Sequence, residues 1–466
     1  MPRRIVIVVG LIGLWIGKQS VGETTIDFDL TREVSLQSFG GVPFCYDLNG
    51  DGSSEVLWLQ SSGIFYSSLF DDAMAGVASK ADREHFCLTA TDSHGKMMWQ
   101  IGTPWREGHP FATHCSERSL DCADIDGDGI REVVCIRGQE LLVVDGITGV
   151  IEQKTNLPAD NVQIVILAKT GNKPTDWTIL AKNTEASYPP HEYANPACFY
   201  DNTLKLLRIA DYFGAGHAPL ARDLDADGHD EFLIGFNRID RKLNGTWTFR
   251  AVPASRWDSR NMHVDSIATG TMNGENCVAY AASVTTYLVS AKDGALRWKH
   301  DDVHPQQCVV GRFVNTAPAD QVFVRNKRSY NQLFDANGVE LWRNEPPLNF
   351  PRGCTPQCRQ QQFHVLDPLI VLHKAGTDMT DQVIYSDGGW PYVLDGAGKR
   401  RADFQHTPNI LQDWGQVPGR PDDFGYGFYV RIADFNGDKQ PEVLINDRRF
   451  AWMYTIPTAV KSNESK

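Results

Sequence analysis

The stretch that decides the fold is Asp124-Ile-Asp-Gly-Asp-Gly-Ile-Arg-Glu132, which runs directly into the apolar segment Val133–Ile136. It recurs three times, as Asp47–Glu55, Asp223–Glu231 and Asp434–Glu442, and each copy again precedes an apolar segment. All four copies carry oxygen-bearing side chains at the first, third, fifth and ninth positions. Because short turns rich in Asp, Asn and Gly commonly connect strands, each copy predicts a tight loop that leads into a β-strand.

The spacing of these oxygen atoms also predicts a calcium site in each loop. Side chains at alternate positions of a tight loop converge on one centre, and Ca²⁺ accepts six to eight oxygen ligands, including a backbone carbonyl expected from the seventh position. Glycine at the sixth position permits the sharp turn, although Lys439 replaces it in the fourth copy. The predicted ligands are Asp47, Asn49, Asp51, Ser53, Glu55, Asp124, Asp126, Asp128, Ile130, Glu132, Asp223, Asp225, Asp227, His229, Glu231, Asp434, Asn436, Asp438, Gln440 and Glu442.

The position of the last acid separates these loops from the EF-hand. An EF-hand places its glutamate at the twelfth position and continues into a helix. Here the acid is ninth, and β-branched or aromatic residues follow. We therefore expect β-type calcium loops, with Ca²⁺ as the cofactor. The alternative is a set of Asp/Gly-rich hairpin turns that bind no metal.

The composition excludes several classes of protein. The chain has 466 residues and a formal net charge of −13, which argues against a nucleic-acid partner. Ten cysteines are too few for a disulfide-rich scaffold of this length. Cys354 and Cys358 could close a small loop, whereas Cys122 and Cys135, which flank the second acidic loop, either pair or are simply buried.

The N-terminus predicts export. Arg3 and Arg4 precede the apolar stretch Ile5–Gly17, and Ser20-Val-Gly22 offers a small-x-small cleavage site. Ile5–Gly17 is shorter than the ~20 residues of a membrane span, and no other stretch is long and apolar enough to span a bilayer. We expect residues 1–22 to be a signal peptide and the mature protein to be secreted or periplasmic. An uncleaved anchor is the alternative.

The four loops belong to a longer series of repeats. Degenerate copies, which keep the turn and the following strand but lack most ligands, begin near residues 171, 271, 315 and 377. Most of the eight positions recur at intervals of about 50 residues, and Asp-Gly or Asn-Gly turns alternate with them, as expected for propeller blades of four short strands. The predicted fold class is an all-β, eight-bladed β-propeller. Seven blades are the alternative, because the copy near 171 is the weakest.

A single propeller domain is expected over residues 23–466. Within each blade, the acidic loop joins the first and second strands. The last blade has only inner strands before the C-terminus, so we expect the N-terminal segment Ile26–Leu36 to complete it and to close the ring. Closure of this kind removes exposed sheet edges.

The loops and their period resemble the FG-GAP, or integrin-type, calcium repeat, which implies a fold rather than a function. A closer resemblance rests on Asn261-Met-His-Val-Asp-Ser-Ile-Ala268 and, one blade later, His304-Pro-Gln-Gln-Cys-Val-Val-Gly-Arg-Phe313. Both are similar to the eight-bladed rhamnogalacturonan lyases of polysaccharide lyase family 11, in which a histidine before an inner strand recurs in consecutive blades and calcium loops support the propeller. The sequence departs from that family at Thr271–Glu275, where the usual aspartates are lost. The resemblance implies β-elimination of a uronate-containing polysaccharide.

The repeat also predicts where a site would lie. Residues six to ten positions before each loop should gather beside the axis, at the end of the propeller opposite the acidic loops. They are His114, His217, His263, His304 and Tyr426, with Arg352, His364, His406 and Arg431 as additions. Arg222 and Arg312 lie nearer the loops and are weaker candidates.

β-Elimination needs a cation to neutralise the uronate carboxylate, a base to remove the C5 proton and an acid to assist the leaving oxygen. Histidine has the pKa of a base near neutral pH, tyrosine can serve as base or acid, and arginine can bind a carboxylate with two hydrogen bonds. The predicted catalytic residues are His263 and His304 as base and partner, Tyr426 as donor, and Arg352. The predicted substrate-binding residues, for an acidic polysaccharide or other glycan, are His114, His217, His364 and Arg431.

The sequence alone leaves open whether the protein is an enzyme. A non-catalytic propeller that binds a glycan or a protein would need only hydrogen-bond donors and aromatic platforms, for which Trp105, Trp257, Trp390 and Trp414 are candidates. A purely structural or adhesive role is a third possibility, because each histidine could simply cap a turn. The sequence has no Gly-x-Ser-x-Gly elbow, no P-loop and no conspicuous acid pair outside the loops, which disfavours hydrolases and nucleotide-binding enzymes.

Overall fold

The computed structural model describes residues 26–36, 38–61, 85–104, 118–159, 162–183, 190–250, 262–302, 304–315, 319–326, 330–345, 369–373, 380–385, 390–404, 429–446 and 449–456. This part of the chain contains β-strands and no helix, so no described segment is a helix that could cross a membrane. The expected signal peptide, residues 1–22, lies outside the described residues.

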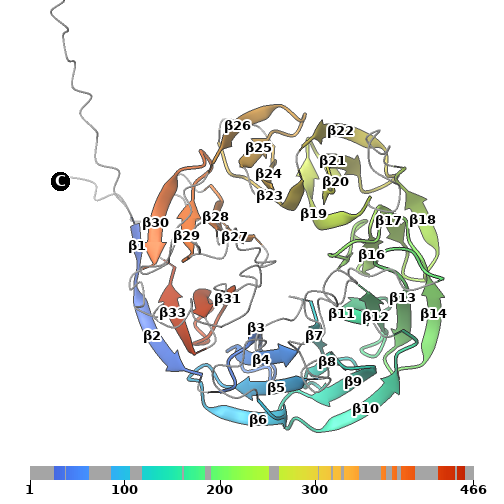
Figure 1. The fold of residues 1–466 in the computed structure, drawn as a ribbon, viewed down its shortest axis with the longest axis vertical. Coiled ribbons are helices and arrows are strands. Elements are labelled where there is room, and N and C mark those ends of the chain that lie inside the picture. The colour runs from blue at the N-terminus through green and yellow to red at the C-terminus, as the bar shows by residue number, and fades with distance from the viewer. Residues whose placement is uncertain are drawn as a thin grey trace, which may run out of the picture.

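Eight sheets stand around a common axis as the blades of a propeller (Figure 1). The prediction of an all-β, eight-bladed fold is confirmed, and the alternative of seven blades is wrong. Blade 1 consists of β3 (Val42–Tyr46), β4 (Glu55–Ser61), β5 (Phe86–Thr91) and β6 (Met97–Gly102). Blade 2 consists of β7 (Leu120–Ala123), β8 (Glu132–Arg137), β9 (Glu140–Asp145) and β10 (Ile151–Asn156). Blade 3 consists of β11 (Val162–Lys169), β12 (Trp177–Asn183), β13 (Ala197–Asp201) and β14 (Leu206–Ala210).

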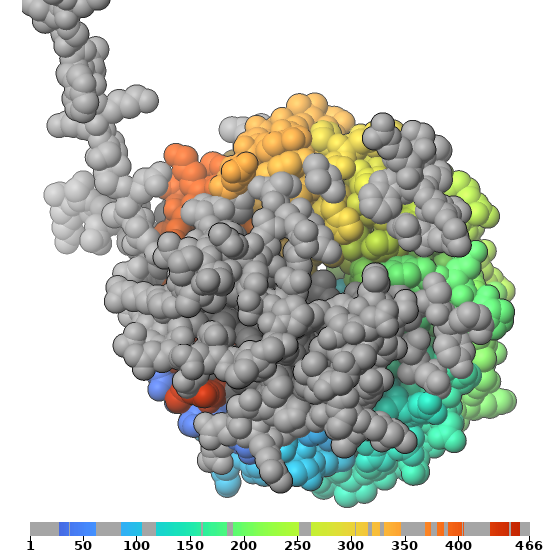
Figure 2. All heavy atoms as spheres, viewed as in Figure 1, coloured from blue at the N-terminus to red at the C-terminus, as the bar shows by residue number. Residues whose placement is uncertain are grey.

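Blades 4 to 6 repeat the same antiparallel order. Blade 4 consists of β15 (Leu220–Arg222), β16 (Glu231–Ile234), β17 (Asn237–Ile239) and β18 (Gly245–Thr248). Blade 5 consists of β19 (Val264–Met272), β20 (Glu275–Ala282), β21 (Thr285–Ser290) and β22 (Leu296–Asp301). Blade 6 consists of β23 (Pro305–Gly311), β24 (Gln321–Asn326), β25 (Asn331–Phe334) and β26 (Glu340–Asn344). Figure 2 shows the coloured segments following one another around the rim, from cyan through green and yellow to orange.

The last two blades contain strands from both ends of the chain. Blade 7 consists of β27 (Ile370–Leu372), β28 (Gln382–Tyr385), β29 (Tyr392–Leu394) and β30 (Arg400–Phe404), to which β1 (Ile26–Phe28) adds in parallel. Blade 8 consists of β31 (Tyr429–Ala433), β32 (Glu442–Asn446) and β33 (Phe450–Thr455), and β2 (Leu30–Ser35) pairs with β33 in antiparallel fashion. The N-terminal segment therefore joins the last two blades and covers the outer edges of β30 and β33.

The middle strands of each blade are buried, and the outermost strand faces solvent. In blade 2, β8 and β9 are buried apart from their ends, whereas β10 alternates between exposed and partly buried residues. This alternation is expected of a strand with one solvated face. Apolar side chains fill the space between neighbouring blades, where Leu57 and Leu88 of blade 1 belong to one cluster with Val133 and Leu142 of blade 2.

Tryptophans of the outermost strands tie neighbouring blades together. The indole of Trp99 donates a hydrogen bond to the carbonyl of Gly146 in the next blade (2.9 Å), and that of Trp247 donates to Ala291 (3.1 Å). Trp390, a candidate sugar platform, is only 2% exposed and packs against Trp452, so it belongs to the core. Trp105, Trp257 and Trp414 lie outside the described residues.

The cysteines in the described part of the chain are all free. Cys122 on β7 and Cys135 on β8 lie on adjacent strands, but Cys122 stands opposite Val133 and Cys135 opposite Leu120. Of the two alternatives for this pair, burial without a disulfide is therefore the one observed. Cys354 and Cys358 lie outside the described residues.

Candidate functional site

The four acidic loops join the first and second strands of blades 1, 2, 4 and 8, as the repeat predicted. In each loop, the glutamate at the ninth position accepts a hydrogen bond from the backbone N–H of the second residue. These bonds join Leu48 to Glu55 (2.8 Å), Ile125 to Glu132 (2.7 Å), Leu224 to Glu231 (2.9 Å) and Phe435 to Glu442 (2.8 Å). The acid therefore closes the loop onto the strand that follows it.

Two residues of each loop, the fourth and the sixth, have a left-handed backbone. Glycine provides both in the first two loops, but Ala226 (φ 61°) and Lys439 (φ 66°) adopt the same conformation. The N–H of Lys439 donates to Asp434 at 2.7 Å, just as the N–H of Gly52 donates to Asp47 at 3.0 Å. The replacement of glycine by Lys439 thus leaves the shape of the fourth loop unchanged.

Acidic groups crowd each loop. In the second loop, ligand atoms of Asp124, Asp126 and Glu132 all lie within 4.8 Å of one another. Burial, together with repulsion from the neighbouring acids, raises the pKa of Glu132 to about 7, and burial likewise raises the pKa of Glu55 and Glu442. A divalent cation would offset this repulsion, and carboxylate and amide oxygens are the ligands that calcium prefers. The acidic loops therefore fit calcium, and in the third loop the ligand atoms of Asp223, Asp225 and Glu231 likewise lie within 4.8 Å of one another.

A second group of titratable side chains lies near the axis of the ring. His217 lies in the connection from β14 to β15, His263 directly precedes β19 and His304 directly precedes β23. Each histidine therefore stands before the innermost strand of its blade, the position that the repeat predicted. The structure brings together these three predicted site residues from three consecutive blades.

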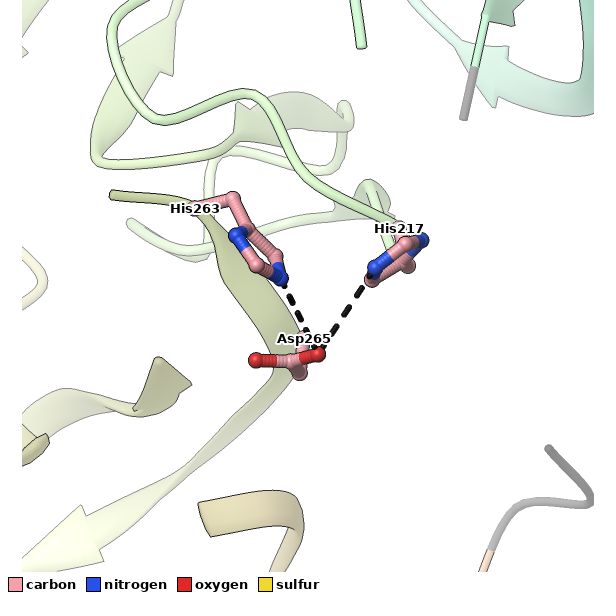
Figure 3. A group of neighbouring side chains, drawn as sticks. All are labelled: His217, His263 and Asp265. Carbon is pink, nitrogen blue, oxygen red and sulfur yellow. Dashed lines mark ion pairs between the residues drawn. The ribbon is translucent and has the colours of Figure 1, made fainter. Parts of the chain in front are cut away.

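The three histidines converge on Asp265, the second residue of β19. Its Oδ1 lies 3.4 Å from Nε2 of His263, 3.7 Å from Nε2 of His217 and 3.7 Å from Nε2 of His304. Figure 3 shows His217 and His263 facing this carboxylate from two sides. Gln306 donates a hydrogen bond to the same oxygen at 2.9 Å. We call His217, His263, His304 and Asp265 the histidine–aspartate cluster.

The carboxylate of Asp265 is almost completely withdrawn from solvent. Its side chain is 1% exposed, and its Oδ2 has no hydrogen-bond partner among the described residues. Burial by itself would raise the pKa of Asp265, but His263, His304 and His217 outweigh burial and hold that pKa well below its usual range. A buried carboxylate in this state favours a positive charge beside it, whether an imidazolium or a metal cation.

Neighbouring groups fix the orientation of the cluster. Nδ1 of His263 lies 3.1 Å from the Ser283 hydroxyl, which leaves Nε2 directed at Asp265. The ring of Tyr193 lies 5.2 Å from that of His263 and 6.3 Å from that of His217, measured between centroids. His304 has a backbone φ of 151°, which L-residues rarely adopt. Such backbone outliers occur preferentially at functional sites.

Buried polar residues of β12 support the segments that carry Tyr193 and His217. The ammonium of Lys182 donates to the carbonyl of Gly216, beside His217, at 2.6 Å and also to the carbonyl of Asn183. The side-chain amide of Asn183 donates to the carbonyl of Asn195, and the side-chain amide of Asn195 donates to the carbonyl of Tyr193. Burial lowers the pKa of Lys182 to about 7.

One further predicted site residue that the structure describes, Arg431, lies apart from this cluster. Arg431 lies on β31 in blade 8, where it donates to the carbonyls of Pro43 (2.8 Å) and Val430 (2.7 Å) and so links blade 8 to blade 1. Outside the described residues lie Tyr426, Arg352, His114, His364 and His406.

Asp265, Tyr193 and Ser283 were not among the residues predicted from the sequence. A signal for Asp265 was present, because residues two apart at the start of a strand, such as His263 and Asp265, project to the same side. No comparable signal exists for Tyr193 and Ser283, which approach the cluster from other parts of the chain.

The cluster can carry out two kinds of chemistry. With a proton on one ring, that imidazolium balances the charge of Asp265 and the neutral histidines can act as bases; a second protonated ring makes the cluster cationic. Alternatively it can hold a divalent metal ion, because ligand atoms of His217, His263 and Asp265 lie within 4.8 Å of one another and imidazole with carboxylate suits zinc or manganese. The contact of Ser283 with Nδ1 resembles the outer hydrogen bond that metal-binding histidines usually make. The buried Oδ2, for which the described part of the chain offers no hydrogen-bond partner, also fits such an ion.

Comparison with known proteins identifies the fold. No known family profile matches the chain, and no curated protein matches it. Among solved structures it is similar to the exotype rhamnogalacturonan lyase YesX, with a TM-score of 0.60 and 15% sequence identity over 93% of this chain and 74% of that one. It is also similar to the rhamnogalacturonan lyase PL11 of Bacillus licheniformis, with a TM-score of 0.56 and 16% sequence identity over 93% of this chain and 74% of that one. A third similar structure is the V. cholerae biofilm matrix protein Bap1, with a TM-score of 0.54 and 11% sequence identity over 94% of this chain and 91% of that one. At these identities, the chain shares with all three proteins the propeller fold alone.

Proposed function

We propose that this protein is a carbohydrate-active propeller that cleaves uronate-containing polysaccharides of the rhamnogalacturonan type by β-elimination. The observation that carries the proposal is the histidine–aspartate cluster, in which three histidines from consecutive blades face one buried carboxylate. The similarity in fold to rhamnogalacturonan lyases supports this class of substrate.

His304 is assigned as the base that removes the C5 proton. Its side chain is 26% exposed, against 16% for His217 and 15% for His263, so it is the most accessible of the three to a substrate. The carboxylate of Asp265, 3.7 Å from its Nε2, stabilises the imidazolium that forms when the ring accepts the proton. His263 is the partner, because Ser283 and Asp265 hold its ring on both nitrogens. As the C5 proton leaves, the C4=C5 double bond forms, the bond from C4 to the glycosidic oxygen breaks, and the predicted donor Tyr426 would protonate that oxygen.

His217 and His263 also supply the positive charge that the uronate carboxylate requires. As imidazolium groups beside Asp265, they would bind that carboxylate and make the C5 proton more acidic. A divalent cation held by His217, His263 and Asp265 would provide the same neutralisation when bound. The calcium that we propose for the acidic loops is structural, since those loops follow the innermost strands, whereas the histidines of the cluster precede them.

We also propose that the protein is exported, where it would meet extracellular polysaccharide. Arg3 and Arg4, the apolar stretch Ile5–Gly17 and the cleavage site Ser20–Gly22 support this proposal. N-terminal sequencing of the protein recovered outside expressing cells should find a chain that begins at residue 23. A chain that stays in the cytosol with Met1 intact would contradict export.

The ultraviolet absorbance of the unsaturated uronate product provides the test. Wild-type protein, incubated with rhamnogalacturonan and a panel of other polyuronates in the presence of calcium, should increase the absorbance. His304→Ala and His263→Ala should each lower the rate by about 10²-fold or more, the usual contribution of a positioned base. His94→Ala is the matched control, because His94 is exposed in the turn between β5 and β6 and should not affect the rate.

Retention on immobilised polysaccharide separates cleavage from binding. Both cluster variants should still be retained if they have lost only the chemical step. No absorbance change with any substrate, from wild-type protein that is nevertheless retained, would contradict the lyase and favour a non-catalytic glycan-binding propeller. Unchanged rates in both variants would contradict the assignment of the site.

A further inference from the structure

One of the four acidic loops contains a cation supplied by the protein itself. In blade 4, the guanidinium of Arg238 lies with Nη2 2.7 Å from Oδ2 of Asp225 and 3.2 Å from Oε2 of Glu231. Both carboxylates are predicted calcium ligands of the third loop. Nη1 of Arg238 donates to the carbonyl of Ala291 in blade 5 at 3.1 Å. The side chain is 6% exposed, so its charge is buried among these acceptors.

The corresponding positions of the other three calcium-type blades carry no charge. Arg238 on β17 pairs with Leu233, which lies two residues after the loop glutamate. The same position on the third strand is held by Ala90 opposite Leu57, Val143 opposite Val134 and Met453 opposite Leu444. All three side chains are apolar and buried. Only the third loop, among these four, has an arginine directed at its acids from this strand.

Arg238 and a metal ion would compete for the same acids, since the guanidinium contacts Asp225 and Glu231 while ligand atoms of Asp223, Asp225 and Glu231 lie within 4.8 Å of one another. A calcium ion bound by Asp225 and Glu231 would share both carboxylates with the guanidinium and would be repelled by its positive charge. The loops of blades 1 and 8 differ, because there the amides of Asn49 and Asn436 contact the loop glutamates, and an amide is neutral and can also present its oxygen to a metal.

Two degenerate loops have lost the need for calcium in related ways. In blade 3, the ammonium of Lys169 binds the carbonyls of Lys173 and Pro174 within its own loop. In blade 6, Gln321 stands where the loop glutamate would be, and its Oε1 accepts a hydrogen bond from the N–H of Phe313 at 2.7 Å. Either an internal cation or a neutral amide thus stabilises a loop that has few or no acids left to neutralise.

We infer that Arg238 takes the place of calcium in the loop 223–231, so that calcium binds at 47–55, 124–132 and 434–442 only. This inference rests on the proposal that the acidic loops bind calcium, and it assigns the third loop to a different class despite its intact ligand pattern. The three calcium loops then belong to blades 8, 1 and 2, which are consecutive in the ring. Blades 4 to 6, which carry the histidine–aspartate cluster, are held together without calcium.

The number of calcium ions bound per chain tests this inference. Wild-type protein is equilibrated with calcium, separated from free ions and analysed for calcium by mass spectrometry, together with Arg238→Met and Arg238→Gln. Methionine matches Met453 at the corresponding position, and glutamine keeps a hydrogen-bond donor without the charge. Wild type should bind three ions in the loops, and each variant should bind one more. Arg241→Gln is the control, since Arg241 is 3.8 Å from Asp227, is more exposed and should leave the number unchanged.

Each outcome decides between the alternatives. Equal calcium contents in wild type and in both Arg238 variants would overturn the inference, as would four loop-bound ions in the wild type. Arg238 variants that need calcium to fold, when wild type does not, would support the inference. The ion would then neutralise the loop acids that the guanidinium neutralises in wild type. An ion gained by the variants when wild type binds none would support the role of Arg238 while contradicting calcium in the other three loops.

Discussion

Asp265 is a buried carboxylate. Three histidines and a glutamine share one of its oxygens, and no residue that the structure describes bonds to the other. Removing a carboxylate from water is unfavourable unless positive charge compensates it. The compensation comes from three consecutive blades, so the charge of one residue depends on how blades 4 to 6 pack against one another. This dependence makes Asp265 the residue on which the proposed function rests most heavily.

Part of the site could be predicted from single residues and part could not. His217, His263 and His304 were predictable because each precedes the innermost strand of its blade, and the repeat places such positions at one end of the axis. Arg431, which was predicted only as an addition to this set, lies within β31 and donates to backbone carbonyls of blades 8 and 1. Position in a repeat fixes where a side chain starts, whereas its contacts depend on neighbours from other blades.

The buried ammonium of Lys182 predicts a specific dependence of stability on pH. Because burial lowers its pKa from 10.5 to about 7, the unfolded chain binds more protons than the folded chain between these two values. Lys182 therefore makes the free energy of unfolding increase as pH rises from 7, and contributes no slope below the folded pKa. Between pH 7 and pH 9, we expect the free energy of unfolding of wild type to increase by about 1 to 2 kcal/mol more than that of Lys182→Met.

Denaturant unfolding at the two pH values measures this difference. Lys205→Met is the control, because Lys205 is exposed on the turn before β14 and should reproduce the wild-type pH dependence. The same pH dependence in wild type and Lys182→Met would show that burial does not lower the pKa of the Lys182 ammonium.

At the scale of the element, the acidic loops were predictable because their information is local. Spacing within nine residues fixes the turn, the closing glutamate and the strand that follows. The role of Arg238 was not predictable, since it comes from another strand of the sheet and only the pairing of β17 with β16 brings it to the loop. An intact ligand pattern therefore does not establish an intact cation site.

The left-handed backbone of Lys439 predicts a stabilising substitution. A non-glycine residue in this conformation costs about 1 kcal/mol that glycine avoids. Lys439→Gly should therefore raise the free energy of unfolding by about 1 kcal/mol, measured by denaturant unfolding at saturating calcium. Lys439→Ala is the matched control, because it removes the ammonium but keeps the strained backbone and should show no such gain. A loss of stability in Lys439→Gly, or an equal gain in both variants, would contradict this account of the loop.

At the scale of the whole molecule, the count of eight blades followed from the period of the repeat. The parallel addition of β1 to blade 7 was not predicted, because no pattern in Ile26–Phe28 indicates which sheet it joins. Backbone hydrogen bonds also connect the three proposed calcium loops across blade boundaries, from Ser54 to Asp434 (2.7 Å) and from Arg131 to Leu48 (3.2 Å). The loops of blades 8, 1 and 2 thus form one continuous edge.

Removal of calcium should therefore affect one part of the ring more than the other. Chelation leaves the acids of blades 8, 1 and 2 uncompensated, whereas Arg238 and Lys169 continue to hold the loops of blades 4 and 3. Hydrogen exchange of the backbone amides should become faster in β3, β4, β7, β8, β31 and β32 on chelation, with little change in β15 to β24. Uniform acceleration around the ring would contradict this division, and no change at all would contradict calcium binding.

The measurement that tests the central claim most directly is the rate at which wild type and Asp265→Asn release unsaturated uronate from rhamnogalacturonan. Asparagine keeps the size of Asp265 but removes the charge that holds the three histidines. We predict that wild type produces a steady rise in ultraviolet absorbance and that Asp265→Asn lowers the rate by about 10²-fold or more, with retention on the immobilised polysaccharide preserved. A folded Asp265→Asn protein that cleaves as fast as wild type would contradict the claim that the histidine–aspartate cluster is the catalytic centre.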